Sequence, residues 1–273
     1  MIHFRLDRIL QYGMLGLVSL SILFPLIFAF AVAIQGETVS PVLLPALHSI
    51  DFSVFHRVFV KEPNLLQWIV NSLVVSCAVT LGQIITSALA AYALALFRWP
   101  GRHLVFLVIM GTLMIPWEST IIVNYLVIAT WHLKDTYWAL ILPFLASGFG
   151  IFLLRQSFKS VPAELREAAT LEGCSRHRYL WAFLMPLSKP AVATLGVYTF
   201  LNTWNQYYWP LLVIDNPVWR TTQVGITAFR SNEIASFDVQ MAATLIVLAP
   251  TILLLIVGQK PLVQGLTAGA LKG

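Results

Sequence analysis

The sequence predicts an all-α integral membrane protein with six transmembrane helices, and three observations support this fold class. Of the 273 residues, 58% are hydrophobic and only 11% are charged, whereas soluble domains carry about 25% charged residues. The charges form clusters separated by long apolar runs. Each run is long enough, at about 1.5 Å per residue, to cross a hydrocarbon core of about 30 Å. Because backbone groups in lipid need hydrogen-bond partners within their own segment, we expect every run to be helical.

The six spans follow one another along a single membrane domain that we expect to cover residues 1–273. Five apolar runs contain no Asp, Glu, Lys or Arg, and the sixth is interrupted only by Glu118. In the first span, Ala31-Val32-Ala33 resembles a signal-peptide cleavage site, but the preceding apolar run exceeds the usual length of about 7–15 residues, so we expect a retained anchor. We expect the spans at about residues 11–34, 66–97, 103–127, 136–156, 190–213 and 239–259.

Lys and Arg residues indicate the orientation, since cytoplasmic loops of membrane proteins are enriched in them. With the N-terminus in the cytoplasm, the inner segments contain twelve Lys and Arg residues and the outer segments contain five. We therefore expect both termini on the cytoplasmic side. This asymmetry also accounts for the net charge of +5, so no nucleic-acid partner is needed to explain it.

The connections between the spans differ in character. The outer segment from Glu37 to Leu66 is expected to be a loop with one short helix near residues 52–60. The inner segment between the second and third spans contains Pro100-Gly101, which favours a tight turn and breaks a helix. The outer segment from Asp215 to Asp238 is polar and contains the turn former Asn216-Pro217.

One polar insert, at residues 160–184 between the fourth and fifth spans, is predicted to be two short helices joined by a glycine. Pro162 suits the first turn of a helix, where its missing N–H costs nothing. The residues from Ala163 to Leu171 are nearly all good helix formers. Gly173 is placed to end that helix in a left-handed conformation, and Ser175 can cap a second short helix.

The first insert helix has a narrow apolar stripe made of Val161, Leu165, Ala168 and Ala169. Two interpretations of this stripe remain open. The insert is either a solvated amphipathic loop, or a docking element whose small alanine side chains fit closely into the groove of a partner.

The residues of the insert also resemble a known motif. Glu167-Ala168-Ala169, followed by Gly173 and then Met185-Pro186-Leu187, resembles the EAA loop of permease subunits in binding-protein-dependent ATP-binding-cassette (ABC) importers. Further segments are similar to carbohydrate-importer permeases of the maltose and glycerol-3-phosphate type. They are Asn71-Ser72-Leu73, residues 97–102, 112–116, 152–156 and 204–211, and the C-terminal residues 265–273.

The resemblance implies a role for each part of the insert and the tail. In similar permeases the EAA helix docks in a cleft of the ATPase and transmits its closure to the spans. The ATPase-coupling candidates are Glu164, Glu167, Ala168, Ala169, Gly173 and Arg176, and the tail residues expected near the ATPase are Ala268, Gly269 and Lys272. One departure is Cys174-Ser175, where Ala-Ser is common.

The resemblance also implies partners and a location. The expected partners are a sister permease, a cytoplasmic ATPase dimer that binds ATP and Mg, an extracytoplasmic solute-binding protein on the outer loops, and the lipid bilayer. This chain itself is expected to bind no cofactor and no metal. The location would be the cell (inner) membrane of a bacterium or archaeon.

Glu118 is the only acid inside an expected span. Ionisable groups in a membrane are costly and usually face the interior of the bundle, so Glu118 is a candidate for lining the pathway or holding a gate. The alternative is a structural acid that binds backbone groups freed by Pro116. Both interpretations stay open.

A polar aromatic segment near the end of the fifth span supplies further pathway candidates: Trp204, Asn205, Gln206, Tyr207 and Tyr208. Aromatic rings stack on sugar rings, and the amides could form hydrogen bonds with sugar hydroxyls. Trp and Tyr also gather at membrane interfaces without any ligand. The sequence alone does not separate these two explanations.

Two other function classes fit the sequence less well. A membrane enzyme is disfavoured because the six histidines are scattered and the motifs His-Glu-x-x-His and Gly-x-Ser-x-Gly are absent. An ion-coupled transporter would need several charges inside the spans. A phosphate-binding loop is also absent, so ATP hydrolysis is expected on another chain. With no Lys or Arg in the apolar runs, the sequence favours a sugar or oligosaccharide as substrate, with glycerol 3-phosphate or a phosphodiester as the alternative.

Overall fold

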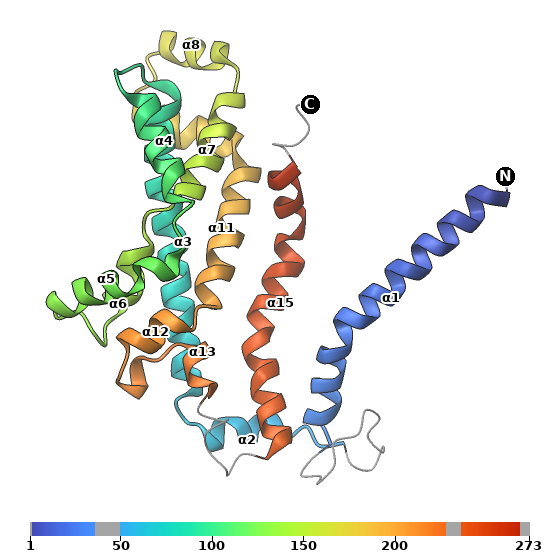
Figure 1. The fold of residues 1–273 in the computed structure, drawn as a ribbon. Coiled ribbons are helices and arrows are strands. Elements are labelled where there is room, and N and C mark those ends of the chain that lie inside the picture. The colour runs from blue at the N-terminus through green and yellow to red at the C-terminus, as the bar shows by residue number, and fades with distance from the viewer. Residues whose placement is uncertain (1, 36–49, 228–235, 268–273) are drawn as a thin grey trace. The chain divides into compact units, whose positions relative to one another are not determined.

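The computed structural model describes residues 2–35, 50–227 and 236–267, and within these ranges the chain forms helices and loops without strands (Figure 1). The tail candidates Ala268, Gly269 and Lys272 lie outside the described residues. The chain divides into two compact units. The first contains Met1–Leu66 and Gly225–Pro250, and the second contains Gln67–Val224 and Thr251–Gly273.

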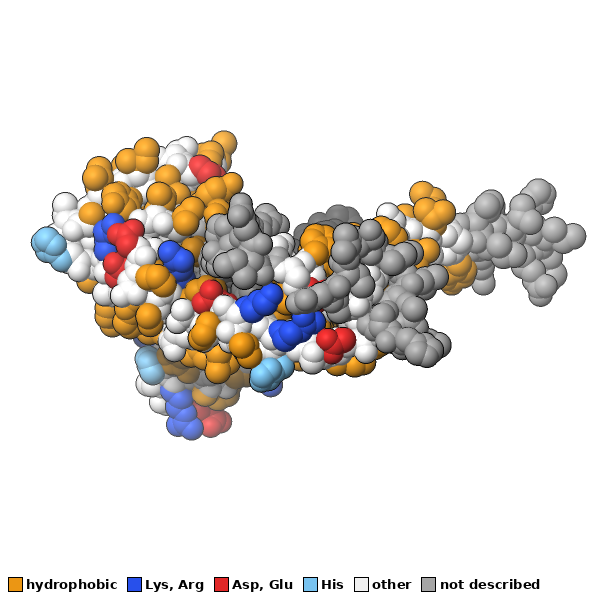
Figure 2. Space-filling model, turned by 90° about the horizontal axis from the view of Figure 1, so that it is seen from below, with side chains coloured by type: hydrophobic (Ala, Val, Ile, Leu, Met, Phe, Trp, Pro, Cys, Tyr) orange, Lys and Arg blue, Asp and Glu red, His pale blue; other side chains and the backbone are white. Residues whose placement is uncertain are grey.

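Three helices are individually long and apolar enough to cross a membrane. They are α1 (Ile2–Ala33), α3 (Leu65–Leu96) and α15 (Phe237–Thr267), at the positions of the first, second and sixth expected spans. Their side chains remain largely uncovered: only 17% of the most apolar window of α1 is buried, and 28% of that of α3. Lipid is the solvent that such surfaces require. Figure 2 shows the molecule from below, where hydrophobic side chains lie among those of Lys, Arg, Asp, Glu and His.

The other expected spans are pairs of helices that meet at a bend. The pairs are α4 (Arg102–Thr112) with α5 (Trp117–Thr130) at 96°, α6 (Tyr137–Ile141) and η2 (Leu142–Phe144) with α7 (Gly148–Ser160) at 48°, and Arg176–Leu187 with α11 (Lys189–Trp204) at 82°. The described residues therefore hold three candidate spans, or up to six if each bent pair forms one. The six-span count stays a prediction.

The spans expected at residues 103–127, 136–156 and 190–213 are not continuous helices. The first is interrupted between Thr112 and Trp117, because Pro116 has no N–H to donate and disfavours helical geometry in the residue before it. The second bends by 48° between Phe144 and Gly148. The 82° bend lies just before the third, whose helix ends at Trp204 and is followed by a separate short helix, α12 (Tyr208–Val213). The chain therefore departs from regular helix at residues 113–116 and again at residues 205–207.

The second unit has two apolar clusters, and α3 contributes to both. Val75 and Val79 pack with α6 and with Trp209, whereas Ala88 and Ala91, nearer the end of α3, pack with Leu154, Leu184 and their neighbours. Small side chains at this end let the helices approach closely. A Cβ added to Gly150 on α7 would collide with Ser87, which shows how close this approach is.

A network of hydrogen bonds joins the loops near the start of α3, and we call it the loop network. The buried Asn71 donates through Nδ2 to the carbonyls of Val218 (2.8 Å) and Arg220 (2.9 Å). Its Oδ1 accepts from Gln67 Nε2 (2.9 Å) and from the Tyr137 hydroxyl (2.8 Å). A single side chain thus fixes η4 (Pro217–Trp219) and its flanks against α3 and α6.

Further bonds extend the loop network. Trp68 Nε1 donates to the carbonyl of Pro217 (2.7 Å), and the backbone N–H of Thr222 donates to Ser72 Oγ (2.8 Å). Lys134 forms an ion pair with Asp215 at 2.7 Å, and this hydrogen bond raises the pKa of Lys134. Two residues of the segment Asn71-Ser72-Leu73, Asn71 and Ser72, therefore anchor the distant loop at residues 217–222. This structural role gives a physical reason for the similarity of this segment to carbohydrate-importer permeases.

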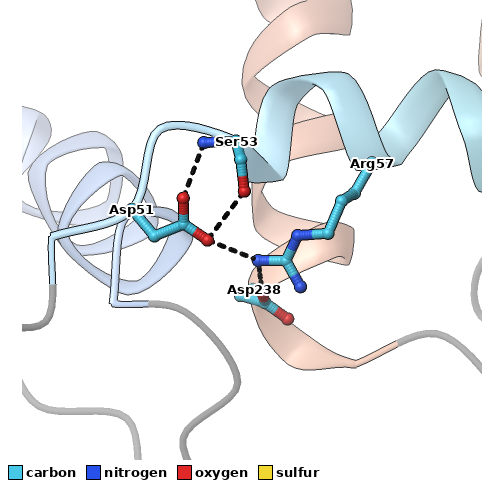
Figure 3. A network of polar contacts seen from close by, with 4 residues as sticks. All are labelled: Asp51, Ser53, Arg57 and Asp238. Atoms are coloured by element: carbon cyan, nitrogen blue, oxygen red, sulfur yellow. Dashed lines mark hydrogen bonds and ion pairs between the residues drawn. The ribbon is translucent and has the colours of Figure 1, made fainter.

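In the first unit, α2 (Val54–Lys61) is the short helix expected near residues 52–60, and Val54 and Val58 form its buried face. Figure 3 shows Arg57 on α2 between two carboxylates. Its Nη2 lies 2.9 Å from Asp238 Oδ2 and 3.2 Å from Asp51 Oδ2. The Ser53 hydroxyl and backbone N–H also donate to Asp51, and these bonds hold the pKa of Asp51 below its usual value. The Asp238 side chain is only 2% exposed, and Arg57 supplies the opposite charge that a buried carboxylate requires.

Candidate functional site

The insert has the local structure that its sequence predicts. Helix α8 (Ala163–Leu171) starts directly after Pro162, and Gly173 then adopts a left-handed conformation with φ of 73°. A second helix, α9 (Arg176–Tyr179), begins at Ser175, whose hydroxyl accepts from the backbone N–H of Arg178 at 3.3 Å. Proline, glycine and serine therefore set the start, the turn and the restart of the insert.

None of the residues of helix α8 is buried. It lies across one end of the second unit, where it is labelled in Figure 1. Glu164 and Glu167 are exposed, and Leu171 is 90% exposed although it is fully apolar. A water-exposed helix with an uncovered leucine and two carboxylates in its first turns is well suited to contact a partner.

Side-chain contacts connect the insert to the end of α3. The Tyr92 hydroxyl donates to the carbonyl of Arg176 at 3.0 Å, and Arg166 Nη1 donates to the carbonyl of Leu96 at 3.4 Å. The guanidinium of Arg176 lies 5.1 Å from the centre of the Phe97 ring. Arg176 is thus placed between the insert and α3, so a displacement of the insert would act on α3.

A groove of about 610 Å³ runs between α8 and the helix that follows it. The stripe residues Leu165, Ala168 and Ala169 form one wall, and Phe183 and Leu187 belong to the other. In the helix that follows α8, Tyr179, Leu180 and Leu184 are buried, whereas Phe183 is 43% exposed. The stripe therefore borders an apolar groove and leaves the outer face of α8 uncovered.

A second hollow, of about 410 Å³, brings together residues from two separate parts of the chain. We call it the polar hollow. Trp117 and Glu118 come from the first turn of α5, and the others come from the end of α11, the break that follows it and the start of α12. The lining comprises Trp117, Glu118, Leu201, Asn202, Asn205, Gln206, Tyr207, Tyr208 and Trp209. Five of the six expected pathway residues thus share one cavity, while their role stays a prediction.

Trp204 is the exception among these candidates. It is buried, with 1% of its surface exposed, and stacks on Phe200 at 5.9 Å between ring centres. Trp209 lines the polar hollow in its place, and the Trp209 Nε1 donates to the carbonyl of Ala139 at 2.9 Å. Neighbouring residues on a helix point about 100° apart, so adjacent positions such as Trp204 and Asn205 face different surroundings.

Asn202 lines the polar hollow although sequence reasoning did not select it. The signal was available, because Asn202, Asn205 and Gln206 are spaced at i, i+3 and i+4 and so share one helix face. This spacing identifies the polar face of α11 better than the run of aromatic residues does.

Glu118 is exposed to the polar hollow, and its carboxylate accepts no hydrogen bond within the described ranges. In particular, no bond joins it to the backbone around Pro116, as the structural interpretation would require. Its place in the first turn of α5 does favour a negative charge, through the helix dipole. Over the same ranges, no group of three or more His, Cys, Asp or Glu side chains is placed to hold a metal ion.

A family model described as "Binding-protein-dependent transport system inner membrane component" matches residues 2–267 of the chain. The chain belongs to this family. It is therefore an integral membrane permease component of a transport system, which confirms the resemblance noted in the sequence and the all-helical membrane fold.

Individual relatives agree with this assignment. The sn-glycerol-3-phosphate transport system permease protein UgpE of Shigella flexneri serotype 5b (strain 8401) is 37% identical over 269 residues, which cover 94% of this chain and 95% of the relative. UgpE of Escherichia coli (strain K12) gives the same values.

Among solved structures, a chain of a bacterial ABC transporter involved in the import of the acidic polysaccharide alginate superimposes with a TM-score of 0.83. It is 26% identical, and the match covers 94% of this chain and 96% of that one. A chain of the alginate transporter in complex with a periplasmic protein bound to an alginate pentasaccharide gives a TM-score of 0.60 at 16% identity, which supports the fold alone.

Proposed function

We propose that this chain is one of two permease subunits that form the pathway of an ATP-driven carbohydrate importer. A separate ATPase dimer binds ATP and Mg and supplies the energy, and an extracytoplasmic solute-binding protein delivers the sugar. Both termini and the insert face the cytoplasm of a bacterial or archaeal cell. Family membership supports the general role, and the Lys and Arg distribution supports the orientation.

The observation that carries this proposal is the exposure of α8. A helix with no buried residue gains little from packing within its own chain, so we infer that another molecule covers its apolar Leu171 and its exposed carboxylates. We assign Glu167, Ala168, Ala169 and Gly173 to the ATPase contact, with Glu164 and Arg176 at its edge. The tail residues Ala268, Gly269 and Lys272 are proposed to approach the ATPase dimer as well.

The polar hollow is proposed to line the transport pathway. Its amides can bind sugar hydroxyls, and its phenol and indole rings can stack on sugar faces. Glycerol 3-phosphate remains the second candidate substrate, because the relatives that are 37% identical carry that name.

Reversing the charge of Glu167 tests the coupling role. In proteoliposomes that contain the complete importer and its binding protein, Glu167→Arg should abolish both sugar uptake and transport-dependent ATP hydrolysis. The same charge reversal in another part of the chain, Glu62→Arg, should leave both activities close to those of the wild type. Retained uptake and retained ATP hydrolysis in Glu167→Arg would refute the docking of α8 on the ATPase.

A further inference from the structure

The charge of the polar hollow suggests which solutes it accepts. We propose that Glu118 is a specificity-determining residue that disfavours solutes bearing phosphate or carboxylate groups and favours uncharged polyhydroxy compounds. This inference rests on the proposed function, because it takes the polar hollow to be part of the pathway.

The lining of the polar hollow contains one carboxylate and no Lys or Arg. All other polar side chains in it are neutral amides, phenols and indoles. Lys134 cannot act as a free compensating cation, since it is paired with Asp215 at 2.7 Å. The uncompensated charge within this lining is therefore negative.

The Glu118 carboxylate is also available to a solute. It is exposed and accepts no hydrogen bond from the described part of the chain. Two carboxylate oxygens can accept from two neighbouring hydroxyls of a sugar, which is a strong, charge-assisted arrangement. The ring of Tyr208, which is 72% exposed in the same lining, offers a stacking surface.

An anionic group in the same position would meet repulsion instead of hydrogen bonds. Phosphate and carboxylate groups have no hydroxyl pair to donate, and their charge repels that of Glu118. The printed names of the relatives and of the structural neighbour mention anionic solutes, glycerol 3-phosphate and alginate. The lining therefore predicts a substrate of a different charge class from theirs.

The charge of the polar hollow can be measured without knowing the substrate. The two free cysteines, Cys77 and Cys174, are first replaced by alanine. The variant Asn202→Cys then places one thiol in the lining of the complete importer in nanodiscs. Its reaction rates with a cationic and an anionic methanethiosulfonate reagent of similar size are divided by the corresponding rates with a free thiol in solution.

Glu118 should favour the cationic reagent by about tenfold, the ratio expected for unit charges of opposite sign at about 6 Å from a carboxylate in a water-like dielectric. In the Glu118→Gln background the ratio should fall to near one. Ser160→Cys, an exposed thiol at the end of α7, serves as the control and should give the same ratio in both backgrounds.

Equal ratios in the two backgrounds, both for Asn202→Cys and for a second probe at Tyr208→Cys, would overturn the role of Glu118. This result is separable from the import assay because it involves no transported solute. A charge preference without any sugar uptake would contradict the proposed substrate class but support the effect of the Glu118 charge on the polar hollow. Sugar uptake without a charge preference would contradict the role of Glu118 and leave the proposed function intact.

Discussion

The loop network and the insert hold polar residues in opposite ways. In the loop network, one buried side chain, Asn71, makes four hydrogen bonds and ties residues 217–220 to α3 and α6. In the insert, α8 buries none of its residues, and hydrogen bonds of Tyr92 with Arg176 and of Arg166 with Leu96 join the insert to the end of α3. One region satisfies its polar groups internally, and the other leaves them for another molecule.

This difference indicates which substitutions affect folding and which affect coupling. Removing an internally satisfied group leaves buried partners without hydrogen bonds, which destabilises the chain itself. Removing an exposed group from α8 leaves no such orphan within the chain, so its cost should appear only when the partner is present. Three substitutions test this contrast, ordered by the size of the expected effect on stability.

Asn71→Leu should cause the largest loss of stability. It leaves the carbonyls of Val218 and Arg220 and the hydroxyl of Tyr137 without their partner. Because each buried unsatisfied group costs about 1–3 kcal/mol, we expect a loss of about 3 kcal/mol or more in unfolding free energy. Thermal unfolding in detergent measures it. Asn124→Leu is the control, since that amide makes only a 3.5 Å contact with Thr120; equal destabilisation by both variants would contradict the role of the loop network.

Gly173→Val should have an intermediate effect. The positive φ of Gly173 disfavours a β-branched residue by about 1–2 kcal/mol, while no atom within 4 Å would collide with a new Cβ. The cost therefore arises from the backbone alone. We expect the substitution to change the orientation of α8 relative to α9 and so to reduce coupled ATP hydrolysis. Gly173→Asn, which tolerates a left-handed conformation, should retain most of the coupling. If both variants coupled equally well, the left-handed turn would not be what positions α8.

Leu171→Ser should have the smallest effect on stability. Because Leu171 is 90% exposed, the unfolding free energy should change by no more than about 0.5 kcal/mol. Binding of the ATPase to the purified permease pair should nevertheless weaken several-fold, as measured by co-purification and by titration. A large loss of stability would mean that Leu171 packs within the chain, and unchanged ATPase binding would remove it from the docking surface.

The sequence predicted the insert better than the polar hollow, and the reason is the range of the interactions involved. Pro162, Gly173 and Ser175 act on their immediate neighbours, so helix, turn and cap can be inferred from local chemistry. The polar hollow joins the start of α5 to the end of α11, and a single sequence gives no signal for such a pairing. The sequence did identify five of the lining residues, because an ionisable side chain is rare inside a membrane span and a polar aromatic segment stands out in an apolar sequence.

Two features were not predicted, for different reasons. The break before Pro116 was missed because a hydropathy window averages over a proline that interrupts the helix. The hydrogen bonds of Asn71 were missed because two of its partners are backbone carbonyls of a distant loop, which carry no sequence identity.

The sharp corner between α4 and α5 has a consequence for the surrounding bilayer. Where a helix stops and restarts, several amides and carbonyls lose their usual partners, and acyl chains cannot replace them. Lipid tails must therefore withdraw from this corner, and either water or another polypeptide has to supply hydrogen bonds to its backbone groups. Pro116 thus determines where the hydrocarbon layer around the chain is interrupted.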